Sequence, residues 1–217
     1  MSLSAIRTIV RQYTDKVLNF NTANDIDPAV NQWYLTCWRE LDKIAPNRTR
    51  TTQTLALVAD QLTAYTLTTT PLALIFMQPP YANRNDRKFT FAVADNDFYT
   101  HENQSDIWVA QESETSLITR PAIDTSMTAT IHYIRRPPTI TSAVDQLHFD
   151  DATLAFGAIG LLLHSINFPD AFYWIDERNP RQPVGAAYTR LRNEMNTFAK
   201  FGINSGLTSI VEGFPYR

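Results

Sequence analysis

Residues 152–166, with the sequence ATLAFGAIGLLLHSI, are apolar on almost every side of a helix. A helix without a polar face is buried, because no side of it is suited to water. Small residues are interspersed within it: Ala155, Gly157, Ala158 and Gly160. Such residues allow close backbone approach, and glycine costs up to about 1 kcal/mol relative to alanine in an exposed helix, so packing must compensate. We therefore expect this helix to be buried, with Asp150 or Asp151 as its N-cap.

The chain after this segment predicts one more amphipathic helix. Residues 168–183 contain three consecutive aromatic residues and predict a loop or a short helix. The last helix is expected to begin near Pro183 and to stop at Gly202. Its apolar residues repeat at steps of four and three: Val184, Tyr188, Leu191, Met195 and Phe198. Residues 139–202 thus predict the helices that complete a bundle.

The N-terminal segment, residues 1–46, predicts an antiparallel helical hairpin. In its first half, apolar residues recur at alternating steps of three and four: Leu3, Ile6, Val10, Tyr13, Val17 and Phe20. After a polar break, Asp27 followed by Pro28 predicts an N-cap with proline at the first helical position. A second apolar stripe then continues to Pro46.

Residues 47–138 lie between these helical segments and have a different pattern. Threonine, β-branched and aromatic residues dominate, which favours strands. In the clearest strand, residues 127–135, apolar side chains alternate with Thr128, Thr130 and His132. The run Asp95-Asn96-Asp97 predicts a hairpin turn. We expect an antiparallel β-module of about five to seven strands inserted into the bundle, hence an α+β fold.

The composition excludes several classes of protein. The 217-residue chain has 19 Lys and Arg against 22 Asp and Glu, a formal charge of −3. It therefore lacks the basic field that holds nucleic acid through counterion release, although DNA could pass a mildly acidic surface without sticking. The one cysteine, Cys37, excludes an internal disulfide framework, and its place in an apolar stripe predicts burial. We expect no signal peptide and no membrane span.

The residues that usually carry catalysis form no recognisable motif. The six glycines include no phosphate-binding loop. The four histidines lie far apart, and no two are spaced as zinc ligands on one helix. Asp95, Asp97 and Glu102 lack the central glycine of a calcium loop. We therefore expect no enzyme, no metal and no cofactor.

Two groups of residues are candidates for contacts between subunits. The first is a set of arginines that brackets the β-module: Arg48, Arg50, Arg135 and Arg136. Arginine is favoured at interfaces for its planar donors, although a solvated rim at the hinge is the simpler explanation of such residues. The second lies in the extended arm, residues 203–217, and just before it: Phe201, Phe214 and Tyr216. This arm could dock on a neighbour or be disordered.

The order of the segments resembles a known family. The features that carry the resemblance are the helix pair with a tryptophan in its second helix, the opening Leu57-Val58-Ala59-Asp60, the strand end Tyr133-Ile134-Arg135-Arg136-Pro137-Pro138, and Leu147-His148-Phe149-Asp150-Asp151 before a small-residue helix. Over about residues 3–200 this arrangement is similar to the head-to-tail adaptor (connector) proteins of tailed bacteriophages, including the tail tubular protein type of short-tailed phages. Its departure from the family is a Gly-poor, Thr-rich β-module.

The resemblance implies a structural role in the virion, at the head-to-tail junction. The chain would form a dodecameric ring beneath the portal protein, contact a tail or nozzle protein, and line a channel through which DNA passes without sequence-specific binding. The alternative is an α+β ligand- or peptide-binding module that uses sheet aromatics: Phe89, Phe91, Tyr99 and Trp108. Exposure of these side chains would favour that alternative.

Overall fold

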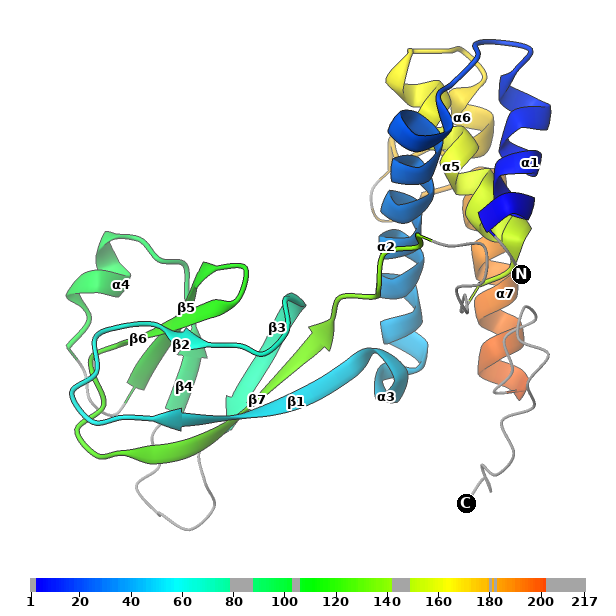
Figure 1. The fold of residues 1–217 in the computed structure, drawn as a ribbon. Helices are drawn as coiled ribbons and strands as arrows, with labels where there is room; N and C mark the ends of the chain where they lie inside the picture. The colour runs from blue at the N-terminus through cyan, green and yellow to red at the C-terminus, as the bar shows by residue number, and fades with distance from the viewer. Residues whose placement is uncertain are drawn as a thin grey trace. The chain divides into compact units, whose positions relative to one another are not determined.

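The computed structural model describes residues 3–78, 88–102, 106–141, 149–179, 181 and 183–201. The chain divides into two compact units, one formed by Met1–Ala45 with Pro137–Arg217 and the other by Pro46–Arg136 (Figure 1). The first unit is helical and the second contains two β-sheets. The predicted α+β class is confirmed. The arm at residues 203–217 lies outside the described residues.

The helical unit is organised around one buried helix. Its elements are α1 (Leu3–Thr14), the π-helix η1 (Thr22–Ile26), α2 (Asp27–Ile44), α5 (Asp151–Ser165), α6 (Ala171–Trp174) and α7 (Ala186–Phe201). Helix α5 packs against α1, α2, α6 and α7, and it lies between α1 and α2 in Figure 1. Helix α5 is apolar on all of its sides. Packing against several helices therefore removes the largest amount of its apolar surface from water.

The small residues of α5 admit a large aromatic side chain from α2. An ideal Cβ at Gly157 would lie 2.0 Å from the ring atoms Cγ and Cδ2 of Trp33. Trp33 is fully buried, and its Nε1 donates to the Thr153 carbonyl at 3.0 Å. The glycine therefore provides the space in which the indole lies flat against the helix. Cys37, one turn further along α2, is also buried, as predicted.

Two details of the N-terminal helices differ from the prediction. Helix α1 ends at Thr14 instead of continuing towards Phe20, although Phe20 is buried. Asp27 is not an N-cap, because η1 leads directly into α2 and the residue before it, Ile26, is already helical. The Asp27 carboxylate instead accepts two hydrogen bonds from Arg7, at 2.8 and 2.5 Å. Asn21 takes the capping role one segment earlier.

The boundaries of the last two long helices follow from local chemistry. Asp150 caps α5, as predicted, by accepting the Thr153 N–H at 2.8 Å. Helix α7 begins at Ala186, later than expected, because Val184 forms an isolated bridge with Asp176. Gly185 has φ of 114°, a conformation that favours glycine, and permits the chain to turn from this bridge into α7.

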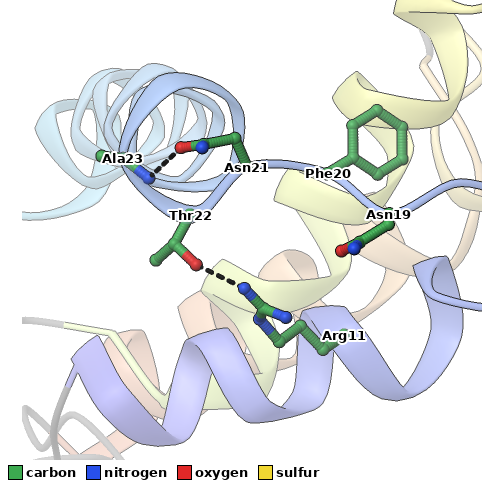
Figure 2. Close-up of a pocket in the computed structure, with 6 residues that line it drawn as sticks. All are labelled: Arg11, Asn19, Phe20, Asn21, Thr22 and Ala23. Atoms are coloured by element: carbon green, nitrogen blue, oxygen red, sulfur yellow. Dashed lines mark hydrogen bonds between the residues drawn. The ribbon is translucent and has the colours of Figure 1, made fainter.

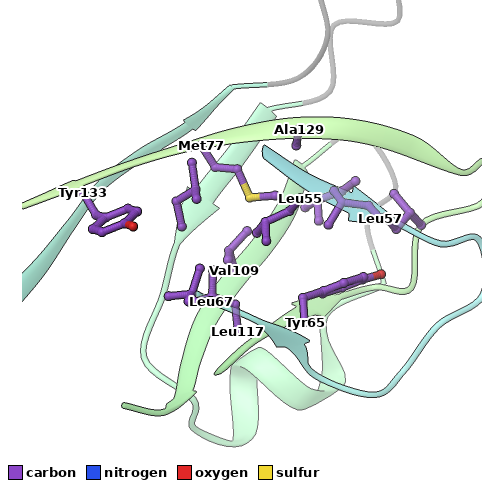
Figure 3. Close-up of a cluster of buried hydrophobic side chains, with 12 residues drawn as sticks. Leu55, Leu57, Tyr65, Leu67, Met77, Val109, Leu117, Ala129 and Tyr133 are labelled. Carbon is purple, nitrogen blue, oxygen red and sulfur yellow. The ribbon is translucent and has the colours of Figure 1, made fainter. Parts of the chain in front are cut away.

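The β unit contains α3 (Pro46–Thr49), α4 (Asn96–Thr100) and seven strands within the described residues. These are β1 (Arg50–Leu57), β2 (Tyr65–Thr66), β3 (Pro71–Gln78), β4 (Lys88–Phe91), β5 (Asp106–Ser113), β6 (Ser116–Arg120) and β7 (Met127–Arg135). One sheet has the order β1-β7-β3 and the other β2-β6-β5-β4. Side chains from both sheets meet in one buried cluster (Figure 3).

The predicted alternation in β7 is confirmed. Ala129, Ile131 and Tyr133 are buried, whereas the intervening side chains are more exposed. β7 is the central strand of its sheet and pairs with β1 from Arg50↔Ile134 to Leu57↔Met127. Because side chains in a strand point alternately to opposite faces, this register sends one apolar row into the core.

The prediction that the β-module is wholly antiparallel is wrong at one pair of strands. β4 and β5 are parallel, with Phe89 opposite Ile107. The chain between them contains α4, whose N-cap Asp95 accepts the Phe98 N–H at 3.0 Å. The expected hairpin turn at residues 95–97 is therefore the start of a short helix. A parallel pair needs a crossover connection, and this helix forms part of it.

Candidate interaction surface

Five aromatic side chains lie on α1, α5 and α6; four of them contact one another, whereas Phe172 contacts His164 of α5. We call Tyr13, Phe156, Phe172, Tyr173 and Trp174 the aromatic surface. Tyr173 is 68% exposed, Tyr13 48% and Phe172 46%, while Trp174 is buried and Phe156 half-buried. The surface thus has a buried base and an exposed rim of large aromatic groups.

The rings hold one another in edge-to-face contacts. Trp174 lies with its ring centroid 5.0 Å from that of Tyr13 and 5.1 Å from that of Phe156. Tyr173 contacts the other side of Trp174, with 5.4 Å between centroids. Edge-to-face pairs at such distances add about 0.5–1.5 kcal/mol each beyond the burial of area. The surface is therefore preorganised, so little side-chain entropy is left to lose when a partner binds.

Charged side chains frame the aromatic surface. The Arg178 guanidinium lies 4.7 Å from the centroid of Phe172, and that of Arg190 lies 5.5 Å from the centroid of Phe156. Arg178 also pairs with Asp176, and its hydrogen bonds lower the pKa of that carboxyl to about 2. His164 contacts the Ile175 carbonyl at 2.7 Å and so fixes the chain that follows α6. Aromatic groups bordered by arginines are typical of protein interfaces.

A buried polar cluster joins the start of α5 to α7. The Glu194 carboxylate, 5% exposed, accepts the Asp150 N–H at 2.9 Å. The Asp150 carboxylate in turn accepts from Arg190 at 3.1 Å. Burial, which outweighs the hydrogen bond from the Asp150 backbone, raises the pKa of Glu194. The cluster fixes the position of α7 on α5, and with it the Arg190 side chain that borders the aromatic surface.

Replacing Glu194 by glutamine is expected to raise the stability of the protein at neutral pH. A carboxyl whose pKa is raised by folding stabilises fully below its unfolded pKa, and this contribution is lost as the pH rises through the folded pKa. Glutamine keeps an acceptor for the Asp150 N–H and removes the buried charge. We expect the midpoint of thermal unfolding of Glu194→Gln to rise by a few degrees at pH 7.5 and to change little near pH 4. An equal shift at both pH values would contradict this assignment.

The loop between α1 and η1 forms a shallow hollow of about 420 Å³ (Figure 2). Its charged side chain, Arg11, donates to the Thr22 hydroxyl at 2.6 Å. The Asn21 side chain accepts from the backbone N–H groups of Ala23 and Asn24, both at 3.0 Å. These polar groups form hydrogen bonds with one another or with the backbone of the same segment, so the geometry of the loop accounts for the hollow.

The predicted arginine set is brought together only in part. Pairing of β1 with β7 places Arg50 opposite Ile134, and the Arg135 guanidinium donates to the Arg48 carbonyl at 2.9 Å. Arg50, Arg135 and Arg136 are exposed and Arg48 is half-buried. Their role at a subunit contact stays a prediction. Phe201 ends α7, with nothing described of its side chain, and Phe214 and Tyr216 lie outside the described residues.

The sheet aromatics are mostly packed inward. Phe89 and Phe91 pack against the main core of the β unit, and Trp108 packs against a second cluster around Phe98. Tyr99 is 49% exposed, but it lies on helix α4 and not on the sheet, contrary to the prediction. The His101 ring stacks on Trp108 at 4.1 Å and contacts the Asp106 carbonyl at 2.6 Å. These contacts do not form the exposed aromatic face that ligand binding by the sheet requires.

In the part of the chain that the structure describes, no three His, Cys, Asp or Glu side chains lie together as a metal site would need. No helix in the same part is long and apolar enough to cross a membrane. A comparison of the sequence with models of known protein families finds no match, and a comparison with curated protein sequences finds none either.

The sequence did not single out the aromatic surface or Glu194. Residues 172–174 are all aromatic, but nothing in their order indicates which of the three side chains is buried. Glu194 had a usable signal, because it lies three residues after Leu191 and four before Phe198 and therefore on the apolar face of α7. A carboxylate on such a face predicts a buried hydrogen-bonded group.

Proposed function

We propose that the protein is a virion structural protein, a head-to-tail adaptor that forms a ring between the portal and the tail of a tailed bacteriophage. The order of its segments resembles that family, and the aromatic surface is the observation that supports the proposal most. An exposed, preorganised group of large aromatic side chains indicates a surface that another protein covers. In this account the surface contacts the portal or a neighbouring subunit.

The aromatic surface, the exposed arginines and the net charge are compatible with a ring of identical subunits. A contact between two different faces of identical subunits closes into a ring when the rotation per subunit permits it. The aromatic surface would provide one such face, and the arginines at the ends of β1 and β7 a polar contact elsewhere. The formal charge of −3 suits a channel through which DNA moves without being retained, since like charges repel at short range.

Native mass spectrometry of the purified protein, with and without the portal protein encoded in the same genome, tests this proposal. We expect monomers when the protein is alone, because the faces become complementary only when the portal aligns the subunits. With the portal ring present, we expect a complex that carries one adaptor per portal subunit. A stable small dimer that shows no affinity for the portal would contradict the proposal.

A further inference from the structure

A second feature of the helical unit is a groove between the C-terminal half of α2 and α7. Its volume is about 510 Å³. We call it the α2–α7 groove, and its lining residues are Glu40, Lys43, Ile44, Arg181, Pro183, Tyr188, Leu191, Arg192, Met195 and Asn196. A volume of this size lies within the range of sites that hold several side chains of a bound peptide or a small ligand.

The floor of the groove is apolar. Leu191 and Met195 are buried, at 1% and 5% exposure, whereas Ile44 on the rim is 40% exposed. Tyr188 is buried as well, and its hydroxyl donates to the Glu177 carboxylate. Burial and this carboxylate raise the pKa of the Tyr188 hydroxyl, so it stays neutral. The floor suits a large apolar side chain, and a methionine there can adapt its shape.

The rim of the groove is positively charged. Three cationic side chains line it, Lys43, Arg181 and Arg192, and all three are exposed. Glu40 is the single carboxylate among the lining residues, and it pairs with Lys43 at 2.6 Å. Arg192 donates to the carbonyl of Pro183, which also lines the groove, and keeps its charge. The rim thus keeps a positive excess, although the chain as a whole is acidic.

We propose that the α2–α7 groove binds an acidic segment of a partner protein that inserts a large apolar side chain between carboxylates. The positive rim of the groove favours a negatively charged occupant. The apolar floor takes the inserted side chain, and Arg181 and Arg192 face the flanking carboxylates with planar donors. This inference does not depend on the proposed ring.

The chain's own arm is a poorer occupant. Residues 203–217 contain one carboxylate side chain, Glu212, and one arginine, Arg217. Such a segment offers the positive rim little to pair with. The arm of a second copy of the chain has the same sequence, so it also lacks the negative charge that would complement the rim of the groove.

Selection from a yeast-displayed library of random dodecapeptides tests the inference with the full chain. We expect the enriched peptides to combine an excess of Asp and Glu with a large apolar residue. The charge-reversed variant Lys43→Glu/Arg181→Glu/Arg192→Glu should bind the enriched peptides at least tenfold more weakly by fluorescence anisotropy, and Ile44→Ala severalfold more weakly. High salt should weaken binding to the unaltered protein, since exposed charges are screened.

A matched variant separates the groove from the overall charge of the protein. Lys16→Glu/Arg39→Glu/Arg136→Glu changes the net charge equally at exposed positions outside the groove. It should bind the peptides like the unaltered protein, and circular dichroism should show both variants folded. The inference is overturned if selection enriches no acidic peptides, if both triple variants bind alike, or if a synthetic peptide of residues 203–217 competes as well as the acidic peptides.

Discussion

Replacing Gly157 by alanine is expected to destabilise the helical unit by about 2–3 kcal/mol, the upper part of the usual range for overpacking a core. The added Cβ would lie 2.0 Å from the Trp33 ring, well inside van der Waals contact. Trp33 cannot move aside easily, because it is fully buried, bonded to the Thr153 carbonyl and packed edge-to-face on Tyr188 at 5.1 Å. The higher helix propensity of alanine offsets at most about 1 kcal/mol of this loss in stability.

Urea unfolding followed by tryptophan fluorescence and circular dichroism measures this loss. Gly160→Ala is the matched comparison in the same helix, since its Cβ would meet Cγ1 and Cδ1 of Ile175 at 2.5 and 2.7 Å, farther than the Trp33 ring atoms and on a smaller side chain. We expect a smaller cost there. In a Trp33→Leu background the cost of Gly157→Ala should shrink, because the two changes act on one contact. Equal stability of Gly157→Ala and the unaltered protein would show that the indole does not lie on this glycine.

If the proposed function holds, replacing Tyr173 by aspartate is expected to abolish most of the affinity for the portal. Tyr173 is the most exposed member of the aromatic surface, so its substitution costs the isolated subunit little stability. Truncation of an aromatic hot spot typically costs about 2 kcal/mol or more, which corresponds to a loss of about 30-fold in affinity at each contact. A buried carboxylate without a partner adds to this loss.

Binding of the portal ring to the immobilised protein, measured by surface plasmon resonance, checks this expectation. Val93→Asp is the control, because Val93 is a 77% exposed apolar residue of the β unit outside the aromatic surface. The control should bind like the unaltered protein. If Tyr173→Asp bound equally well, the aromatic surface would have no part in the contact.

The regular elements were predictable where one local rule dominates. The strand at 127–135 alternates strictly, and its apolar row is buried as expected. The buried helix and its Asp150 cap were visible for the same reason, since an apolar helix and a capping residue are both local signals. Sequence also predicted that the small residues of α5 allow close approach. It could not identify Trp33 as the partner, because that contact joins residues far apart in the chain.

The errors arose where one signal fits two structures. An Asp-rich tripeptide suits a hairpin turn and a helix N-terminus equally, and at residues 95–97 the helix forms. Asp27 before Pro28 looked like a cap, but the preceding π-helix supplies the first turn and leaves this carboxylate for Arg7. Tyr13 is part of the apolar stripe predicted for the first helix, yet it is half exposed and belongs to the aromatic surface.

Negative-stain electron microscopy of the protein mixed with the portal ring from the same genome tests the central claim most directly. The account predicts an added layer of density on one face of the portal, with the symmetry of the portal and an open channel along the axis. Tyr173→Asp should remove that layer, and Val93→Asp should leave it in place. Portal rings that remain bare at saturating concentrations of the protein, or density attached without rotational symmetry, would contradict the proposal that the protein is a head-to-tail adaptor.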